Sequence, residues 1–163
     1  MNLNQERQAG APRFPIGNYV LRITGEPEVA VSKANNVMLV FTFECVGRFG
    51  NDKSVNPEGV VDGVPVKFAG WEFPFWATFF QDQQKNLVNP GLASIHKACG
   101  LPLEFELGDD NKPIGVEYTG KELIAQCKTT EEFVTDEDGK RLLNPITGEP
   151  VKISRRNIVQ IYS

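Results

Sequence analysis

The stretch Val37-Met38-Leu39-Val40-Phe41-Thr42-Phe43-Glu44-Cys45-Val46 decides the fold class of this chain. It is dominated by β-branched and aromatic residues, which favour a pleated, half-buried strand. Because side chains alternate across a strand, Leu39, Phe41, Phe43 and Cys45 share one face. We therefore predict a strand over 37–46 whose more apolar face lies in the core.

The same alternation predicts further strands on both sides of this stretch. Residues 66–80 are rich in aromatics and are interpreted as one or two strands, broken at Gly70 and Pro74. The segment 122–128 places Leu123, Ala125 and Cys127 on one face and extends toward 133. The predicted strands cover 19–24 with a continuation at 29–31, then 37–46, 66–80, 122–133 and 151–162.

One convincing helix is predicted between the third and fourth of these strands. Asn89-Pro90-Gly91 begins it, and Leu92, Ile95 and Cys99 recur at helical spacing. Gly100 ends the helix and Pro102 prevents its continuation. This order favours a mainly all-β fold, a five-stranded OB-fold Greek-key barrel. We expect a flexible N-terminal arm over 1–13 and a single domain over 14–163.

Residues 47–65 are predicted to be a long inserted loop. They are rich in Gly, Asn, Asp and Pro, and long loops in compact domains are commonly functional or mobile.

Length and charge set the general class of the chain. Its 163 residues suit one ordinary domain, and its formal net charge is −4. The sequence contains no apolar run of about 18 residues, so no membrane span is predicted. The first seven residues lack the apolar stretch of a signal peptide. We expect a cytoplasmic protein.

The three cysteines, Cys45, Cys99 and Cys127, are far apart and odd in number. They are predicted to be reduced, buried thiols, as is usual in the cytoplasm. The chain has no CxxC motif and a single histidine, so neither a zinc site nor another cofactor is expected. That histidine, His96, is assigned a structural role on the helix.

The strongest chemical feature is a set of seven aromatic residues between 68 and 80. Proteins that bind single-stranded nucleic acid need flat rings on which bases stack, each stack contributing about 1–3 kcal/mol. Alternation puts Phe75, Ala77 and Phe79 on one face and Trp76, Thr78 and Phe80 on the other, and one face must be core. The candidates for base stacking are Trp71, Phe73, Trp76 and Phe80.

Binding of single strands also needs a basic track for the phosphates. Alternation sends consecutive Arg155 and Arg156 to opposite faces unless a bulge intervenes. Acidic residues gather elsewhere, at 104–106, 109–110, 131–132 and 136–138, so a one-sided basic groove is compatible with the net charge. The candidate phosphate contacts are Arg22, Lys33, Arg48, Lys67, Lys121, Lys128, Arg155 and Arg156.

Several short motifs resemble one family. They are Phe14-Pro15-Ile16-Gly17-Asn18-Tyr19, Ser32-Lys33 followed by Met38 to Glu44, Leu92 to Gly100, Gly120-Lys121-Glu122-Leu123, and Asn157-Ile158 before a final aromatic. Over roughly 14–162 the chain resembles phage-encoded single-stranded DNA-binding proteins with an OB-fold. The resemblance implies a protein that coats DNA during phage replication and recombination in the host cytoplasm, with replication or recombination proteins as partners. The 47–65 loop and the aromatic segment after it depart from the plainest members.

The sequence is also compatible with other functions. A structural or adaptor β-domain of a virion or replication complex would use exposed aromatics as a protein interface. A metal-dependent nuclease would need carboxylates such as Asp109-Asp110 or Asp136-Glu137-Asp138, but Asp138-Gly139 is typical of a hairpin turn. No GxSxG, HExxH or phosphate-binding glycine loop occurs, so we do not expect an enzyme. The choice between DNA and RNA, and between one copy and a homo-oligomer, also stays open.

Overall fold

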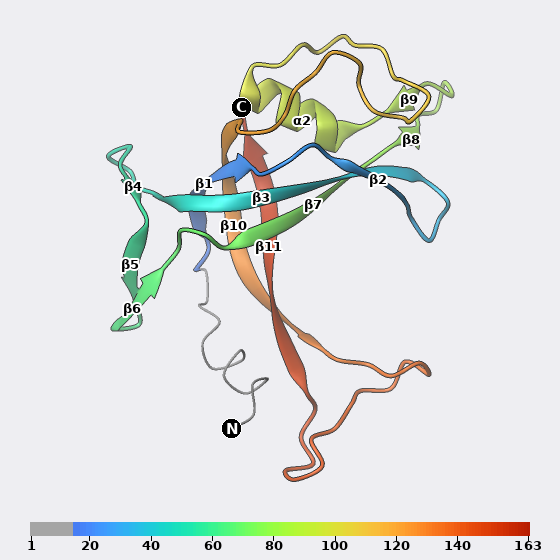
Figure 1. Cartoon of the computed structure of the whole chain (residues 1–163). Helices are drawn as coiled ribbons and strands as arrows, with labels where there is room; N and C mark the ends of the chain where they lie inside the picture. Colours follow the sequence, from blue (N-terminus) through green and yellow to red (C-terminus); the bar gives the residue numbers. More distant parts are fainter. Residues whose placement is uncertain (1–14) are drawn as a thin grey trace.

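The computed structural model describes residues 15–163, and the side chains of 131–132 and 153–156 are outside what it describes. The expected arm over 1–13 therefore lies outside the described residues. The rest forms mainly β structure with one helix (Figure 1). The elements are β1 (Gly17–Ile23), β2 (Glu28–Val31), β3 (Val37–Phe49), β4 (Val55–Asn56), β5 (Glu58–Val61), β6 (Val64–Lys67), β7 (Glu72–Thr78), β8 (Phe80–Gln81), β9 (Leu87–Val88), α2 (Pro90–Cys99), β10 (Glu122–Phe133) and β11 (Lys152–Tyr162).

The main sheet is antiparallel, which confirms the predicted mainly β class. Its order is β11-β10-β1-β3-β2, and β3 also pairs with β7 and β4. The path from one edge to the other is thus β7, β3, β1, β10 and β11. The edges β7 and β11 approach each other. Within residues 15–163 no ladder joins them, so the sheet is not closed into a barrel.

The core lies on the face that the alternating pattern predicts. Leu39, Phe41 and Phe43 of β3 have no exposed surface, and neither does Ala125 of β10. Removing each large apolar side chain from water contributes about 1.5–3 kcal/mol to folding. The Phe41 ring packs edge-on against Tyr118, with ring centroids 5.1 Å apart.

Helix α2 begins and ends as predicted. The Asn89 side chain caps it by accepting a hydrogen bond from the Leu92 N–H at 3.0 Å. Its amide group also donates to the Ala77 carbonyl at 3.0 Å, which ties the helix start to β7. Gly100 adopts the left-handed conformation, with φ of 69°, that a C-terminal cap favours.

Two details of the predicted fold are wrong. The segment 47–65 is not an open loop, because β3 continues to Phe49 and is followed by β4 and the β5–β6 hairpin. The hairpin turns at Asp62 and Gly63, whose φ values of 53° and 78° are those of a type I′ turn. Pro74 does not break a strand either; it lies within β7 opposite Thr42, on an edge strand where its missing N–H is tolerated.

Strands β10 and β11 run far beyond the rest of the sheet. Because β1 begins at Gly17, opposite Cys127, the later part of β10 pairs with β11 alone. We call residues 128–157, the outer part of this ladder with its connecting turns, the arm. Figure 1 shows it projecting away from the other strands. No helix among residues 15–163 is long and apolar enough to cross a bilayer.

Candidate nucleic-acid interface

Trp76 is the clearest exposed aromatic residue among the sequence candidates. It lies on the outer face of β7, opposite Val40 of β3, and its exposed fraction is 53%. Exposing a large indole costs free energy unless a ligand or partner covers it. Trp76 is therefore available for stacking.

The other three aromatic candidates differ from one another. Phe80 on β8 is 48% exposed and is also available. Trp71 is half-buried against the core, and its indole N–H donates to the Lys67 carbonyl at 2.9 Å. Phe73 was wrongly assigned to the interface. It has no exposed surface, because its position on β7 points into the core opposite Phe43.

The predicted basic residues whose side chains the structure describes do not gather into one groove. Arg22 pairs with Glu122 across β1 and β10, with 3.6 Å between guanidinium nitrogen and carboxylate oxygen. The Arg48 guanidinium lies 6.0 Å from the centre of the Tyr19 ring. The exposed lysines Lys33, Lys67 and Lys121 lie in separate turns or hairpins.

A row of charged residues crosses the outer face of the main sheet, over strands β10, β1, β3 and β7. Cross-strand register aligns Glu122 with Arg22, Arg22 with Glu44, and Glu44 with Glu72. This row holds three acids and one base, so it disfavours phosphate there. A nucleic acid stacked on Trp76 must direct its phosphates away from this row.

The remaining predicted bases lie along the arm. Lys128 is exposed on β10 opposite Asn157, and β11 brings Arg156 opposite Thr129 and Arg155 opposite Thr130. The side chains of Arg155 and Arg156 lie outside the described residues, so their predicted orientation stays a prediction.

The arm also carries a cluster that the sequence did not suggest. The Arg141 guanidinium lies 3.7 Å from the centre of the Phe133 ring, and the Lys152 ammonium lies 5.2 Å from it. Phe133 remains 37% exposed. The register places Phe133 opposite Lys152, and a bridge between Thr135 and Arg141 returns the chain to the ring. The sequence signal for this arrangement is the Asp138-Gly139 turn, because it predicts a hairpin that brings Arg141 back beside residues 133–135.

Two of the four acidic stretches, 109–110 and 136–138, supply turn residues. A carboxylate oxygen of Asp136 accepts hydrogen bonds from the N–H groups of Asp138 and Lys140, both at 2.9 Å, which confirms the predicted turn. Asp110 accepts from the Lys112 N–H at 3.0 Å. Among the described residues, no group of three or more His, Cys, Asp or Glu side chains is placed to hold a metal ion.

All three cysteines are free thiols. Cys45 and Cys127 are buried as predicted, and burial raises the pKa of each to about 12, which makes the reactive thiolate scarce. Cys99 is only half-buried, between α2 and the start of β10, where its thiol lies 3.7 Å from the Glu122 carbonyl.

No protein-family model matches this chain, and no curated protein matches it.

Proposed function

We propose that this protein binds single-stranded nucleic acid with little sequence preference, as the phage single-stranded DNA-binding proteins that it resembles do. The observation that carries the proposal is the cluster of Phe133 with Arg141 and Lys152 on the arm. A guanidinium plane packed on an aromatic ring, with an ammonium beside it, offers a flat stacking surface and phosphate contacts at one place, which is what single-strand binding requires.

Arg141 is well suited to such a contact. Guanidinium planes stack on bases as well as on aromatic rings, and their N–H groups donate to phosphate oxygens. Packing against Phe133 holds the side chain in place before the ligand arrives, so less conformational entropy is lost on binding. The exposed Lys128 lies on the same arm and extends the basic track toward the sheet.

Trp76 supports a second stacking position on the sheet itself. The Trp76 side chain lies on the outer face of β7, away from the core, and the neighbouring Val40 on the same surface is half-buried. The acidic row to one side favours a path on which bases face Trp76 while phosphates turn away from that row.

We propose the OB-fold for the main sheet on its strand order. The path β7-β3-β1-β10-β11, with α2 between β7 and β10 in the sequence, is the order that a five-stranded OB barrel requires. The two edges lie near one another, as closure of such a barrel requires. In OB-folds that bind oligonucleotides, the connection between the last two strands is a ligand-binding loop, and here that connection is the arm.

The experiment is a titration of a labelled oligo-dT followed by fluorescence anisotropy at two salt concentrations. We expect binding that weakens with salt and that Trp76→Ala reduces by about 1–3 kcal/mol, or about 5- to 150-fold. Ile114→Ala, which truncates an equally exposed apolar residue away from the strands, is the control and should change nothing. Absence of binding at low salt would overturn the proposal.

A competition with oligo-U distinguishes the nucleic acids. Equal competition by both would mean that the site reads bases and phosphates without contacting the 2′-hydroxyl. Parallel quenching of intrinsic fluorescence in Trp71→Phe, but not in Trp76→Phe, would identify Trp76 as the stacked indole.

A further inference from the structure

The end of the arm exposes apolar side chains that the described part of the chain leaves uncovered. We call residues 142–151 the terminal lobe. Its Leu142 and Leu143 are 42% and 59% exposed, and Ile146 is 92% exposed. Single exposed apolar residues are ordinary, but three within five positions concentrate apolar surface, which is typical of an interaction site. The terminal lobe carries one charged residue, Glu149, so it is an apolar end on a charged arm.

Hydrogen bonds hold the turn of the terminal lobe in one conformation. The side-chain oxygen of Asn144 accepts from the N–H groups of Ile146 at 2.8 Å and Thr147 at 3.3 Å. The Asn144 carbonyl accepts from the Gly148 N–H at 2.8 Å, and Gly148 has a φ of 70°, which glycine adopts without strain. Because this turn is formed before a ligand arrives, a contact through Ile146 loses little conformational entropy.

The terminal lobe adjoins the cations of the arm. Leu142 follows Arg141 in the sequence, and its N–H donates to the Val134 carbonyl at 2.8 Å. On the other side, Lys152 is three positions from Glu149. At about 3.3 Å per residue this is at most about 10 Å, the length of about three stacked nucleotides at 3.4 Å each. A nucleic acid whose phosphates contact these cations therefore brings its next bases to the terminal lobe.

Charge decides which part of a nucleic acid the terminal lobe can contact. Phosphates favour Arg141 and Lys152, whereas Glu149 disfavours them at the lobe. The acidic turn at 136–138 lies elsewhere, since Figure 1 shows the two turns of the arm well apart. The terminal lobe is therefore suited to bases rather than to the phosphate backbone.

The shape of Ile146 decides which bases it suits. Bases of a single strand stack on flat groups, such as an aromatic ring or a guanidinium plane. Aliphatic side chains such as Ile and Leu instead act as wedges against the faces of paired bases. The last base pair of a duplex, from which a single strand departs, presents such a face at its outer side.

We propose that the terminal lobe binds the junction between single and double strand, with Ile146 against the outer face of the last base pair. This inference rests on the proposed function, because the cluster of Phe133, Arg141 and Lys152 holds the adjoining single strand. It extends the ligand from a single strand to a single strand that ends in a duplex. Removing the Ile146 side chain and the face of the base pair from water supplies the added affinity.

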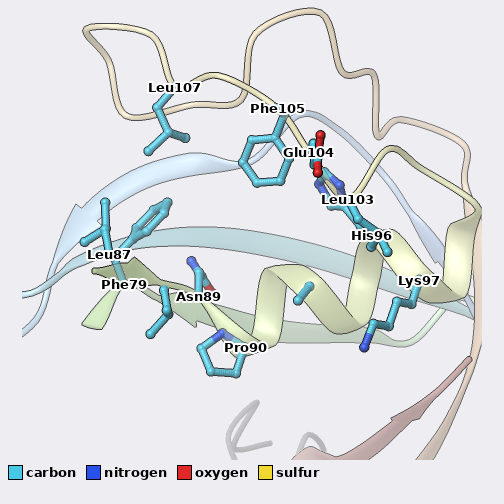
Figure 2. Close-up of a pocket in the computed structure, with 12 residues that line it drawn as sticks. Phe79, Leu87, Asn89, Pro90, His96, Lys97, Leu103, Glu104, Phe105 and Leu107 are labelled. Carbon is cyan, nitrogen blue, oxygen red and sulfur yellow. The ribbon is translucent and has the colours of Figure 1, made fainter. Parts of the chain in front are cut away.

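A second exposed apolar surface provides the matched control. It is a groove of about 630 Å³ beside α2, and Figure 2 shows Leu103, Phe105 and Leu107 along one wall. Leu103 is 59% exposed, and Figure 1 shows α2 and the arm at opposite ends of the molecule. Substitution of Leu103 therefore removes exposed apolar surface without changing the arm.

The test compares two DNA ligands by fluorescence anisotropy at one salt concentration. One is oligo-dT, and the other is a DNA hairpin that carries the same dT sequence as a single-stranded tail. We expect the wild type to bind the tailed hairpin at least about tenfold more tightly, as burial of one aliphatic side chain predicts. Ile146→Ser should reduce this difference to about twofold or less and leave the affinity for oligo-dT unchanged. Ile146→Leu and Leu103→Ser should keep the wild-type preference.

The results separate this inference from the proposed function. Equal wild-type affinities for oligo-dT and the tailed hairpin would overturn the inference alone, and so would a preference that survives Ile146→Ser. Absence of oligo-dT binding at low salt would instead remove the proposed function, and this inference with it. Ile146→Ser and Leu103→Ser should unfold at the same urea concentration as the wild type, because both side chains are exposed.

Discussion

His96 and Tyr118 are joined in the core by a hydrogen bond of 2.6 Å between the imidazole Nε2 and the phenol oxygen. The other ring nitrogen, Nδ1, lies 2.6 Å from the Pro102 carbonyl, which can only accept. Nδ1 therefore carries a proton, and in the neutral imidazole the Tyr118 hydroxyl donates to Nε2. Burial raises the pKa of the Tyr118 phenol, which keeps it a donor. The predicted structural role of His96 agrees with this geometry, since the ring links α2 to the segment that leads into β10.

Removal of this donor should destabilise the protein. Tyr118→Phe leaves the buried Nε2 without a partner, and an unsatisfied buried polar atom costs about 1–3 kcal/mol. Urea unfolding followed by intrinsic fluorescence would measure the loss. Tyr162→Phe, at an exposed tyrosine, is the matched control. Equal stability of Tyr118→Phe and wild type would argue against a buried hydrogen bond.

Glu26 should make stability depend on pH in the acid range. Burial raises the pKa of its carboxyl, but hydrogen bonds from the Thr119 hydroxyl and from the N–H groups of Thr119 and Tyr118 outweigh this, and the pKa is lowered overall. A carboxyl whose pKa is lower in the folded state than in the unfolded state stabilises the fold at pH values above its unfolded-state pKa. That stability is lost as the pH falls through the folded-state pKa.

The check is the urea midpoint of wild type and Glu26→Gln over a series of pH values. The wild type should be more stable near neutral pH, and the difference should shrink as pH falls. Glu28→Gln removes the same charge from neighbouring β2 and controls for net charge. A constant difference at every pH would contradict the role assigned to the Glu26 carboxylate.

Substitution of Phe73 should affect folding rather than binding. Phe73→Ala removes a ring with no exposed surface and should cost about 3–5 kcal/mol of unfolding free energy. Phe73→Leu keeps more of the volume, so the folded protein should bind oligo-dT with wild-type affinity. If folded Phe73→Leu bound oligo-dT more weakly than wild type, Phe73 would contribute to binding and this prediction would be wrong.

Substitutions in the cluster of Phe133, Arg141 and Lys152 should distinguish stacking from phosphate contact. Arg141→Ala should weaken oligo-dT binding and reduce the slope of log affinity against log salt by about 1, because one phosphate contact is lost. Phe133→Leu should weaken binding with a smaller change in slope, since the cations remain. Anisotropy titrations at several salt concentrations measure both. Lys53→Ala, at an exposed lysine beyond β3, should leave the slope unchanged.

Much of the fold could be predicted because local physics decided it. The alternation in 37–46 and 122–128 specified which residues are buried, and Asn89 with Gly100 specified both ends of α2. The β5–β6 hairpin was missed although Asp62-Gly63 between valine-rich segments is a hairpin signal. The abundance of Gly, Asn and Pro around it suggested a loop. The prediction for Phe73 is wrong because a strand break was expected at Pro74; in the unbroken β7, Phe73 shares the buried face with Ala77, opposite to Trp76.

The sequence by itself determined strands, helix and turns, because side-chain alternation and capping act between neighbours in the chain. The tertiary structure alone decided which side chains of the candidate site meet. Phe133, Arg141 and Lys152 lie eight or more positions apart in the sequence. They come together through the register of the arm, which depends on hydrogen bonds between distant segments.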